Sequence, residues 1–590
     1  MPPGVKSCHG CNSFKIEEIV KPWHGLTLEP GGFMDNYSIA DNFSLLSKLM
    51  EIHGENSFKS KTYSIAAFNI EKLPLQLSET PHDKIFSIKG IGDSIGKKVL
   101  EMLDTGKMQT LNDYLEKTPV GVVEMLHIKG IGPKKINTIW KELEVESIGE
   151  LLYACNENRL LLYKGFGEKT QDNIRESIEF YLQNQGNYLY AQIESYAHAM
   201  NEKLSAHFTK DKISLTGSFR RQMETIDVLE WCATASSHDL KKFFLETGMD
   251  AIEEDAETIL FKGKENVKLK FYLVDGVSFC KKLFQTSCSE DFVIGWEKQY
   301  SLSAQAISEE EIFQTAGLPF IIPALRENDS ILAKAKDNKL KDVIQPSDVR
   351  AIIHSHSNWS DGVNTIEDMA NDLVKRGYEY LVITDHSKSA FYANGLTSER
   401  IREQHRYIDE LNARLKPFKI FKSIECDILN DGSLDYSNDI LATFDLVIAS
   451  VHSNLKMNEE KAMMRLLNAI KDPYTTILGH MTGRLLLSRN GYPVDHKKVV
   501  DACAENNVVI ELNAHPRRLD IDWRWIDYAL EKNVLISIDP DAHSINGFND
   551  VKYGVLAAQK GGLTKEQNLS SYSLNQFEDY LEKIKKLKGI

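Results

Sequence analysis

The sequence has 590 residues, a length typical of three to five domains. Its composition, with 42% hydrophobic and 26% charged residues, is that of a globular protein. A formal net charge of −15 excludes a simple polycation that coats nucleic acid, although a local basic face is compatible with it. Eight dispersed cysteines favour reduced thiols, and neither a signal core nor a membrane-spanning run is found. We therefore expect a cytoplasmic protein that contacts no membrane.

Residues 1–33 are expected to be a leader or a tag-like tail. They carry Cys8 and Cys11 as a lone C-x-x-C pair, and a zinc site built from such pairs needs a second one nearby. We therefore expect no zinc here, and interpret the segment as a tag or as the result of a start site placed too far upstream.

Apolar residues recur at three- and four-residue steps from about residue 34 to 186, which predicts helices. Three glycine segments punctuate this pattern: "IKGIG" at 88–92, "IKGIG" at 128–132 and "YKGFG" at 163–167. Glycine lets a backbone approach a phosphate closely, and a following helix offers free N–H groups. The segments resemble helix-hairpin-helix motifs, which implies that they hold the DNA backbone without reading sequence. The glycines concerned are Gly90, Gly92, Gly130, Gly132, Gly165 and Gly167.

Strand-like and helix-like runs alternate from residue 350 to the end of the sequence. The seven strand-like runs are "RAIIHSH", "YLVITDH", "IFKSIECD", "DLVIASVH", "TILGH", "VVIELNAH" and "VLISIDPDAH". This alternation predicts parallel strands, and seven units predict a closed or nearly closed barrel. The carboxyl ends of such strands meet at one face, where active sites are built.

Nearly every one of these strands ends in histidine, aspartate or glutamate. Unrelated core histidines would not fall at the same point of each strand, so we predict a metal site. Imidazole and carboxylate ligands suit manganese, zinc or iron. Nine groups exceed the needs of one ion, so we expect two or three ions with Glu425 as the bridge. The predicted ligands are His354, His356, Asp361, His386, Glu425, His452, His480, Asp541 and His543.

Six segments around these residues resemble the PHP (polymerase and histidinol phosphatase) family: "HSHSNWSDG", "ITDHS", "ECDILNDGSLDY", "ASVHS", "GHMTGRLLL" and "DPDAHS". The resemblance implies a distorted seven-stranded β/α barrel, a trinuclear metal site on the nine positions and hydrolysis of phosphate esters. Met481 departs from it, because relatives usually have proline there. The expected catalytic residues are His354, His356, Glu425, His452, Asp541 and His543.

Three arginines follow the ligand strands and could hold a phosphate: Arg484, Arg517 and Arg518. Solvated surface arginines are the alternative interpretation. Arg484 is the one that we predict to bind phosphate.

The stretch "TGSFRRQMETIDVLEWC", residues 216–232, resembles the nucleotidyltransferase signature of family X DNA polymerases. The segment "EEEIFQTAGLPFIIPALRE", residues 309–327, resembles the one preceding the PHP domain in bacterial members. Together these resemblances imply a multidomain α+β and α/β chain. The expected domains are a helical lyase-like DNA-binding domain at 34–115, a fingers-like domain at 116–186, a palm at 187–290, a thumb remnant and linker at 291–345, and the PHP domain at 346–590.

The palm departs from the family where its metals would bind. Polymerisation needs two carboxylates at i and i+2 of one strand and a third on a neighbouring strand. Those positions hold Val228, Glu230 and Lys268, and a slip to Asp227 would make Leu229 its partner. We therefore predict an inactive polymerase site, and we expect Lys268 to form an ion pair with Glu230.

Other family positions are retained. Gly217, Ser218 and Arg221 match residues that hold the incoming triphosphate. Lys98, six residues after Gly92, matches the lysine that forms a Schiff base with an abasic-site sugar, and a solvated helix lysine is the equal alternative.

The resemblance implies a DNA repair protein whose PHP domain is a metal-dependent 3′→5′ exonuclease, with abasic-site endonuclease or 3′-phosphatase as further activities. We expect a monomer that acts on gapped, nicked or 3′-ended DNA. The alternatives are a gap-filling polymerase, a histidinol-phosphate-like small-molecule phosphatase and a non-enzymatic DNA scaffold. The missing carboxylates argue against the polymerase, and the hairpin repeats argue against the small-molecule phosphatase. The full ligand set argues against the non-enzymatic scaffold.

Overall fold

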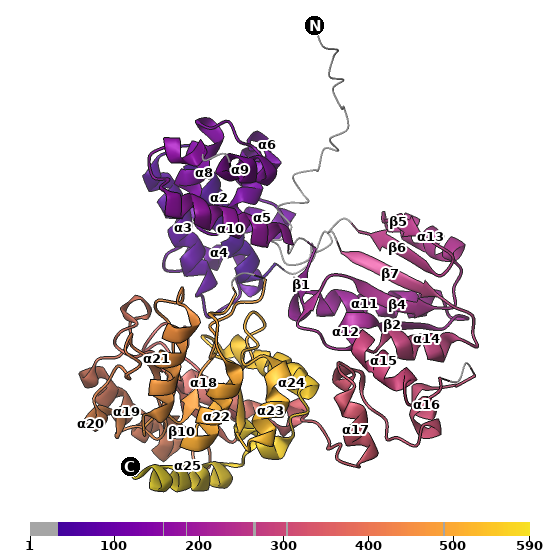
Figure 1. Ribbon diagram of the computed structural model, residues 1–590. Coiled ribbons are helices and arrows are strands. Elements are labelled where there is room, and N and C mark those ends of the chain that lie inside the picture. Colours follow the sequence, from indigo (N-terminus) through magenta and orange to yellow (C-terminus); the bar gives the residue numbers. More distant parts are fainter. Residues whose placement is uncertain (1–33, 157–158, 184–185, 264–266, 303–304, 488–489) are drawn as a thin grey trace. The chain divides into compact units, whose positions relative to one another are not determined.

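Figure 1 shows the computed structural model, which describes residues 34–156, 159–183, 186–263, 267–302, 305–487 and 490–590. The chain forms two compact units with a boundary after residue 185. The segment expected to be a tail, with Cys8 and Cys11, lies outside the described residues. Within the described part of the chain, no helix is both long and apolar enough to cross a membrane.

The first unit is built of helices whose apolar faces share one core, which includes Phe43, Leu46 and Ile136. Residues recurring every three or four positions place such side chains on one helix face. The helices are α2 (Asn36–Ile52), α3 (Ser57–Glu71), α4 (His82–Ile85), α5 (Asp93–Thr105), α6 (Gln109–Lys117), α7 (Val120–Glu124), α8 (Pro133–Lys141), α9 (Ile148–Asn156) and α10 (Glu168–Gln183).

The three glycine segments of this unit form turns of one geometry. The first glycine of each has a left-handed backbone, with φ of 94° at Gly90, 90° at Gly130 and 95° at Gly165. Side chains are strained at such angles, which explains the glycine. The second glycine precedes the next helix directly, as Gly92 precedes α5 and Gly132 precedes α8.

The second unit begins with a five-stranded sheet in the order β2-β4-β7-β6-β5. Strands β4 and β7 are parallel and the other neighbours are antiparallel. Aromatic side chains, among them Trp231, Phe244 and Phe271, fill its core. The strands are β2 (Ile213–Thr216), β4 (Leu229–Ala233), β5 (Asp250–Glu254), β6 (Thr258–Lys262) and β7 (Lys268–Leu273); β1 (Tyr188–Leu189) and β3 (Thr225–Ile226) form a separate pair.

Seven helices accompany this sheet and lead to the barrel. They are α11 (Tyr190–His207), α12 (Gly217–Arg220), α13 (Ser237–Glu246), α14 (Phe279–Thr286), α15 (Glu290–Glu297), α16 (Glu309–Thr315) and α17 (Ser330–Lys336), counted over the described residues 186–345. The segment at 309–327, which resembles the one preceding the PHP domain in bacterial family X polymerases, contains α16 and a short 3-10 helix at Pro323–Leu325.

The C-terminal part of the second unit is a parallel β/α barrel. Its sheets have the orders β10-β9-β8 and β11-β12-β13-β14-β15. Parallel bridges between His386 and Glu425 and between Ser355 and Ala542 join the sheets at both seams. The strands are β8 (Ala351–Ile352), β9 (Tyr380–Ile383), β10 (Lys419–Lys422), β11 (Glu425–Asp427), β12 (Ile448–Ser450), β13 (Ile477–Leu478), β14 (Val509–Asn513) and β15 (Ile536–Asp539).

Strands β10 and β11 follow each other within one extended stretch, so the described residues 350–590 contain seven strand positions. This closed arrangement confirms the predicted fold class. Strands such as β9 and β14 are buried along their whole length, which explains their nearly continuous apolar runs. Helices surround the strands (Figure 1): α18 (Ile366–Arg376), α19 (Ser398–Arg414), α20 (Asn438–Leu441), α21 (Glu459–Lys471), α22 (His496–Asn506), α23 (Ile526–Glu531), α24 (Val551–Lys560) and α25 (Leu574–Lys588).

Candidate metal centre

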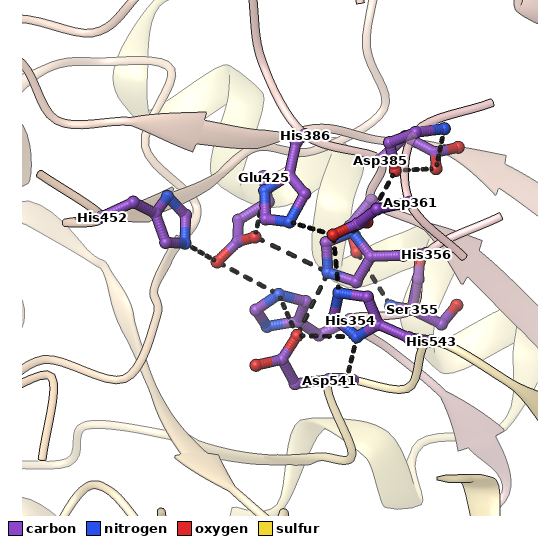
Figure 2. Close-up of polar contacts among 12 residues, drawn as sticks. His354, Ser355, His356, Asp361, Asp385, His386, Glu425, His452, Asp541 and His543 are labelled. Atoms are coloured by element: carbon purple, nitrogen blue, oxygen red, sulfur yellow. Dashed lines mark hydrogen bonds and ion pairs between the residues drawn. The ribbon is translucent and has the colours of Figure 1, made fainter. Parts of the chain in front are cut away.

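The nine predicted ligand side chains gather at the carboxyl ends of the barrel strands, and Figure 2 labels all of them except His480. Closure of the barrel brings its first and last strands together. At this seam the His356 N–H donates to the Ala542 carbonyl at 2.8 Å. His354, His356, Asp361, His386, Glu425, His452, Asp541 and His543 form overlapping clusters, and His480 joins them through Glu425. Most are buried, whereas the side chains of Asp361 and His543 are 32% and 42% exposed. The centre therefore opens to solvent on the side of these two residues.

Two of these residues hold unusual backbone angles beside the seam. His354 has φ of 59° and Asp541 has φ of 52°, in the left-handed region that residues other than glycine rarely adopt. Each such residue costs on the order of 1 kcal/mol or more, and strain of this kind is retained mainly at functional sites. The angles turn both side chains from the strand ends into the cluster.

Glu425, on β11, lies at the middle of the cluster. Its Oε1 is 3.0 Å from Nε2 of His452 and 2.9 Å from Nε2 of His480, while its Oε2 is 3.0 Å from Nδ1 of His386. Nε2 of His354 lies 3.2 Å from Oε1. One carboxylate therefore faces imidazoles from four other strand ends, as a bridging ligand would.

The donor atoms fall into three groups, as counted over the described residues, whose members lie within 4.8 Å of one another. His356 belongs to the first two groups, His386 to the first and third, and Glu425 to the second and third. The groups are His356, Asp361, His386 and His543; His354, His356, Glu425 and Asp541; and His386, Glu425 and His452.

Several buried atoms of the centre lack the hydrogen bond that burial normally requires. Among the described residues, Nε2 of His354, Nδ1 of His386 and Oε2 of Glu425 have none, although oppositely charged atoms are near. Burying lone pairs and imidazole nitrogens without partners costs free energy, and a cation bound between them would remove that cost. The residues present therefore fit divalent metal ions.

The pKa shifts of these side chains also fit a site for divalent metal ions. Burial and the neighbouring imidazoles of His543 and His386 lower the pKa of His356 to about 3, so its ring is neutral and can donate lone pairs. Burial alone would lower the pKa of His386, but Glu425 and Asp361 raise it to about 10. Burial alone would raise the pKa of Glu425, but His452 and His354 hold it well below its usual value. Metal ions would displace the protons that these carboxylates retain on the imidazoles.

The structure adds carboxylates that sequence reasoning missed. Asp427 accepts from Ser387 and lies 3.2 Å from Nδ1 of His452. Asp385, fully buried, accepts from Ser357, Ser360 and Gln404 and so fixes the loop that carries Asp361. Glu511 contacts two predicted ligands. Each lies on or just after a buried strand, where a charged residue is unusual, and that signal could have identified them.

The arginines differ from the prediction. Arg484 donates to the carbonyl of Arg518 at 2.9 Å, to Asp522 at 2.7 Å and to Glu224 of the palm. Its guanidinium is largely buried in this ion-pair group, which corrects the prediction that Arg484 holds a phosphate. Arg517 is exposed, whereas Nε of Arg518 lies 3.5 Å from Asp541 at the edge of the centre.

In the palm, the predicted triphosphate and metal positions are engaged with the protein itself. Glu230 accepts from the Tyr272 hydroxyl at 2.7 Å and from the Ser218 N–H at 3.1 Å. Among the described residues, Glu230 and Lys268 form no ion pair, because Glu230 is in register with Lys270 of β7; the expected pair is wrong.

The retained signature residues Gly217 and Arg221 also face protein groups. A Cβ on Gly217 would lie 1.6 Å from the Glu230 carboxylate, so the carboxylate requires glycine there. Arg221 pairs with Glu327 at 3.0 Å and donates to the Cys288 carbonyl at 3.1 Å. In the first unit, Lys98 donates to the Thr110 hydroxyl at 2.6 Å.

Comparison with known proteins agrees with this geometry. The chain is 33% identical over 556 residues to the DNA polymerase/3′-5′ exonuclease PolX of Bacillus subtilis (strain 168), which covers 90% of this chain and 97% of that protein. The chain belongs to the PolX family. In the present chain, the helix-hairpin-helix domain family matches residues 34–108, the SAM-like helix-hairpin-helix tandem family matches 122–179, and the PHP domain family matches 353–515.

Proteins with only part of this architecture are also similar. A probable phosphatase of Thermoanaerobacter sp. (strain X514) is 27% identical over 248 residues, 40% of this chain and 96% of that protein. A probable phosphatase of Acetivibrio thermocellus is 30% identical over 170 residues, 28% of this chain and 64% of that protein. The predicted resemblance to bacterial family X polymerases with a C-terminal PHP domain is confirmed, and the family relationship indicates DNA binding and phosphoesterase chemistry.

Proposed function

We propose that this protein is a metal-dependent DNA phosphodiesterase whose barrel removes nucleotides from 3′ ends, while its palm binds DNA without polymerising. The observation that carries the proposal is the gathering of nine imidazole and carboxylate side chains at one barrel face. The Bacillus subtilis relative is named as a DNA polymerase and 3′-5′ exonuclease, which supports the reaction proposed. Abasic-site cleavage and 3′-phosphatase activity are further reactions of the same kind.

Two or three Mn²⁺ or Zn²⁺ ions, with Fe²⁺ as a further candidate, would be held by the nine side chains. Such ions generate a nucleophile from water near neutral pH and neutralise charge on the phosphoryl oxygens. Glu425 holds imidazoles from four other strand ends around itself and so fixes the spacing of the donor groups. His543 and Asp361 form the open side, where a DNA 3′ end can approach. Arg518, beside Asp541, is placed to orient a phosphate oxygen.

An inactive palm is supported by the state of its three metal-binding positions. Val228 has no lone pair, Lys268 is positively charged, and both oxygens of Glu230 already accept hydrogen bonds from Tyr272 and Ser218. Two divalent ions therefore have no carboxylate pair to hold them. The positions of Gly217, Ser218 and Arg221 then serve the structure of the palm rather than nucleotide binding.

The helix-hairpin-helix turns of the first unit are proposed to hold the DNA backbone. A Cβ added to Gly130, Gly132, Gly165 or Gly167 would meet no atom within 4 Å, so these turns face open space. Lys98, with its hydroxyl partner Thr110, remains a candidate for abasic-site lyase chemistry. A monomeric state and a cytoplasmic, nucleoid-associated location also remain predictions.

Lys89 and Lys164 are exposed lysines of two hairpin turns. The double variant Lys89→Gln, Lys164→Gln is expected to bind duplex DNA more weakly, to the same extent for all DNA sequences. Each lost phosphate contact should lower the slope of log K against log salt by about 0.9. Fluorescence anisotropy with gapped DNA at several salt concentrations measures this slope. Lys61→Gln, on α3 outside the hairpins, is the matched control and should leave it unchanged. An unaltered slope in the double variant would show that the hairpins do not contact DNA.

One reaction tests the proposed function. Purified protein is incubated with Mn²⁺, four deoxynucleotides and a gapped duplex that carries a 5′-labelled primer, and the products are resolved on a sequencing gel. Shortening without extension is the expected result. Extension would show that the assignment of Val228, Glu230 and Lys268 as an inactive site is wrong. An unchanged primer would favour a phosphatase, in line with the probable phosphatases that match the barrel, or a DNA-binding scaffold.

A further inference from the structure

Glu511 is a fully buried carboxylate on β14 that contacts two of the predicted metal ligands. Its Oε1 is hydrogen-bonded to Nδ1 of His354, and its Oε2 accepts the backbone N–H of His480 at 2.5 Å. The side chain is 0% exposed. It therefore ties the middle of β14 to the residues that follow β8 and β13.

Burying a carboxylate is costly unless it is paired. Among the described residues, the ion pair formed by Glu511 is with His354, and no lysine or arginine pairs with it. The two carboxylate oxygens contact one imidazole and one backbone N–H of ligand residues, and Oε2 also accepts from the Asn513 amide at 3.4 Å. Its burial is thus explained by the centre rather than by the fold of the strand alone.

The contact decides which ring nitrogen of His354 faces the donor cluster. In the neutral form of the ring, which is the form that binds metal, Nδ1 donates its hydrogen to Glu511 and Nε2 keeps a free lone pair. That Nε2 makes no hydrogen bond and lies 3.2 Å from Glu425 and 3.4 Å from Asp541. A carboxylate behind a metal-binding imidazole fixes its tautomer and orientation and raises its basicity.

Asn513 extends this arrangement from the same face of β14, two residues further on. Its amide donates to Oε2 of Glu511 at 3.4 Å and to Asp541 at 3.1 Å. His452 repeats the pattern independently, with Asp427 at its Nδ1 and Glu425 at its Nε2. Two of the imidazoles that face Glu425, those of His354 and His452, therefore each have a second carboxylate at Nδ1.

We propose that Glu511 is a positioning residue that aims His354 Nε2 at a metal ion and holds the backbone of His480 in register with it. This inference rests on the proposed function, because it assumes that the nine side chains bind metal. Glu511 does not itself reach the ion. Its effect is on the affinity of the site that contains His354, His356, Glu425 and Asp541.

The test compares Mn²⁺ binding to metal-free wild-type protein and to Glu511→Gln by calorimetric titration. Glutamine keeps the shape of the side chain, but its amide cannot serve both donors as a carboxylate does. The dissociation constant of one class of site is expected to rise roughly 10- to 100-fold, with the remaining sites unchanged. Hydrolysis of the labelled primer should fall at low Mn²⁺ and recover in part at saturating Mn²⁺.

Asp445→Asn is the matched control. Asp445 accepts the Lys422 N–H at 2.8 Å, just before β12 and so at the opposite end of the strands from the predicted ligands. It should leave the Mn²⁺ affinity at the wild-type value. Circular dichroism of the metal-free proteins checks that each variant is folded. If Glu511→Gln does not fold, Glu511→Asp decides, because it keeps the charge but shortens its reach and should also weaken one class of site.

The outcomes separate this inference from the proposed function. Wild-type protein that neither binds Mn²⁺ nor shortens the primer would overturn both. Wild-type protein that does both, with folded Glu511→Gln or Glu511→Asp equal to it in Mn²⁺ affinity and in low-metal activity, would overturn the positioning role alone.

Discussion

Replacing Glu425 by glutamine is expected to abolish most of the phosphodiester hydrolysis of this protein. The carboxylate lies within 3.2 Å of imidazole nitrogens of His354, His386, His452 and His480. A neutral amide cannot bridge ions between them. Loss of a group that only orients a ligand costs about 10- to 100-fold, so loss of the shared ligand should cost more than about a hundredfold. Initial rates of primer shortening in Mn²⁺ measure the effect.

Metal content gives an independent measure of the same change. Dialysed Glu425→Gln protein should retain fewer Mn²⁺ ions per chain than wild type, as determined by elemental analysis. Glu505→Gln, an exposed glutamate on α22, is the matched control and should keep both the rate and the metal content. A Glu425→Gln rate within tenfold of wild type would exclude the bridging role and with it the assignment of the centre.

Replacing Arg326 by methionine is expected to destabilise the second unit by about 3–5 kcal/mol. The Arg326 side chain is 0% exposed, and its Nη1 donates to Glu309 at 2.6 Å. Its guanidinium also lies 5.0 Å from the ring centre of Phe313 and 5.3 Å from that of Phe320. Removal of the arginine leaves one partner, Arg220, for the buried Glu309 carboxylate. Thermal and denaturant unfolding, followed by tryptophan fluorescence, measure the loss.

Two further variants test the cause of this loss. Arg406→Met, on the exposed face of α19, should change stability by less than about 0.5 kcal/mol. Combining Arg326→Met with Glu309→Gln should recover part of the loss, because the buried carboxylate that has lost one of its two arginine partners is then neutral. A loss below about 1 kcal/mol in Arg326→Met would show that the pair contributes little to the fold.

Much of the barrel and its centre could be predicted from the sequence by itself. A strand buried on both faces reads as an apolar run, and its chemistry begins where that run ends in His354, Glu425 or Asp541. Parallel strands place those ends on one face, so local pattern and topology together suffice. The helices of the first unit and its glycine turns could also be predicted, because hydrophobic periodicity and the residue preferences of turns are local properties of the sequence.

Tertiary structure decided the contacts between segments distant in sequence. Arg484 has the same local signal as a phosphate-binding arginine, yet the approach of Glu224, 260 residues away, takes up its guanidinium. The register of β4 on β7 places Lys270, not Lys268, beside Glu230. Glu511 acquires its role only when barrel closure brings His354 against it. The local pattern of the chain identifies the donor groups and the strand ends that carry them. Which of these groups are in contact depends on strand register and barrel closure, because these set distances that no local pattern encodes.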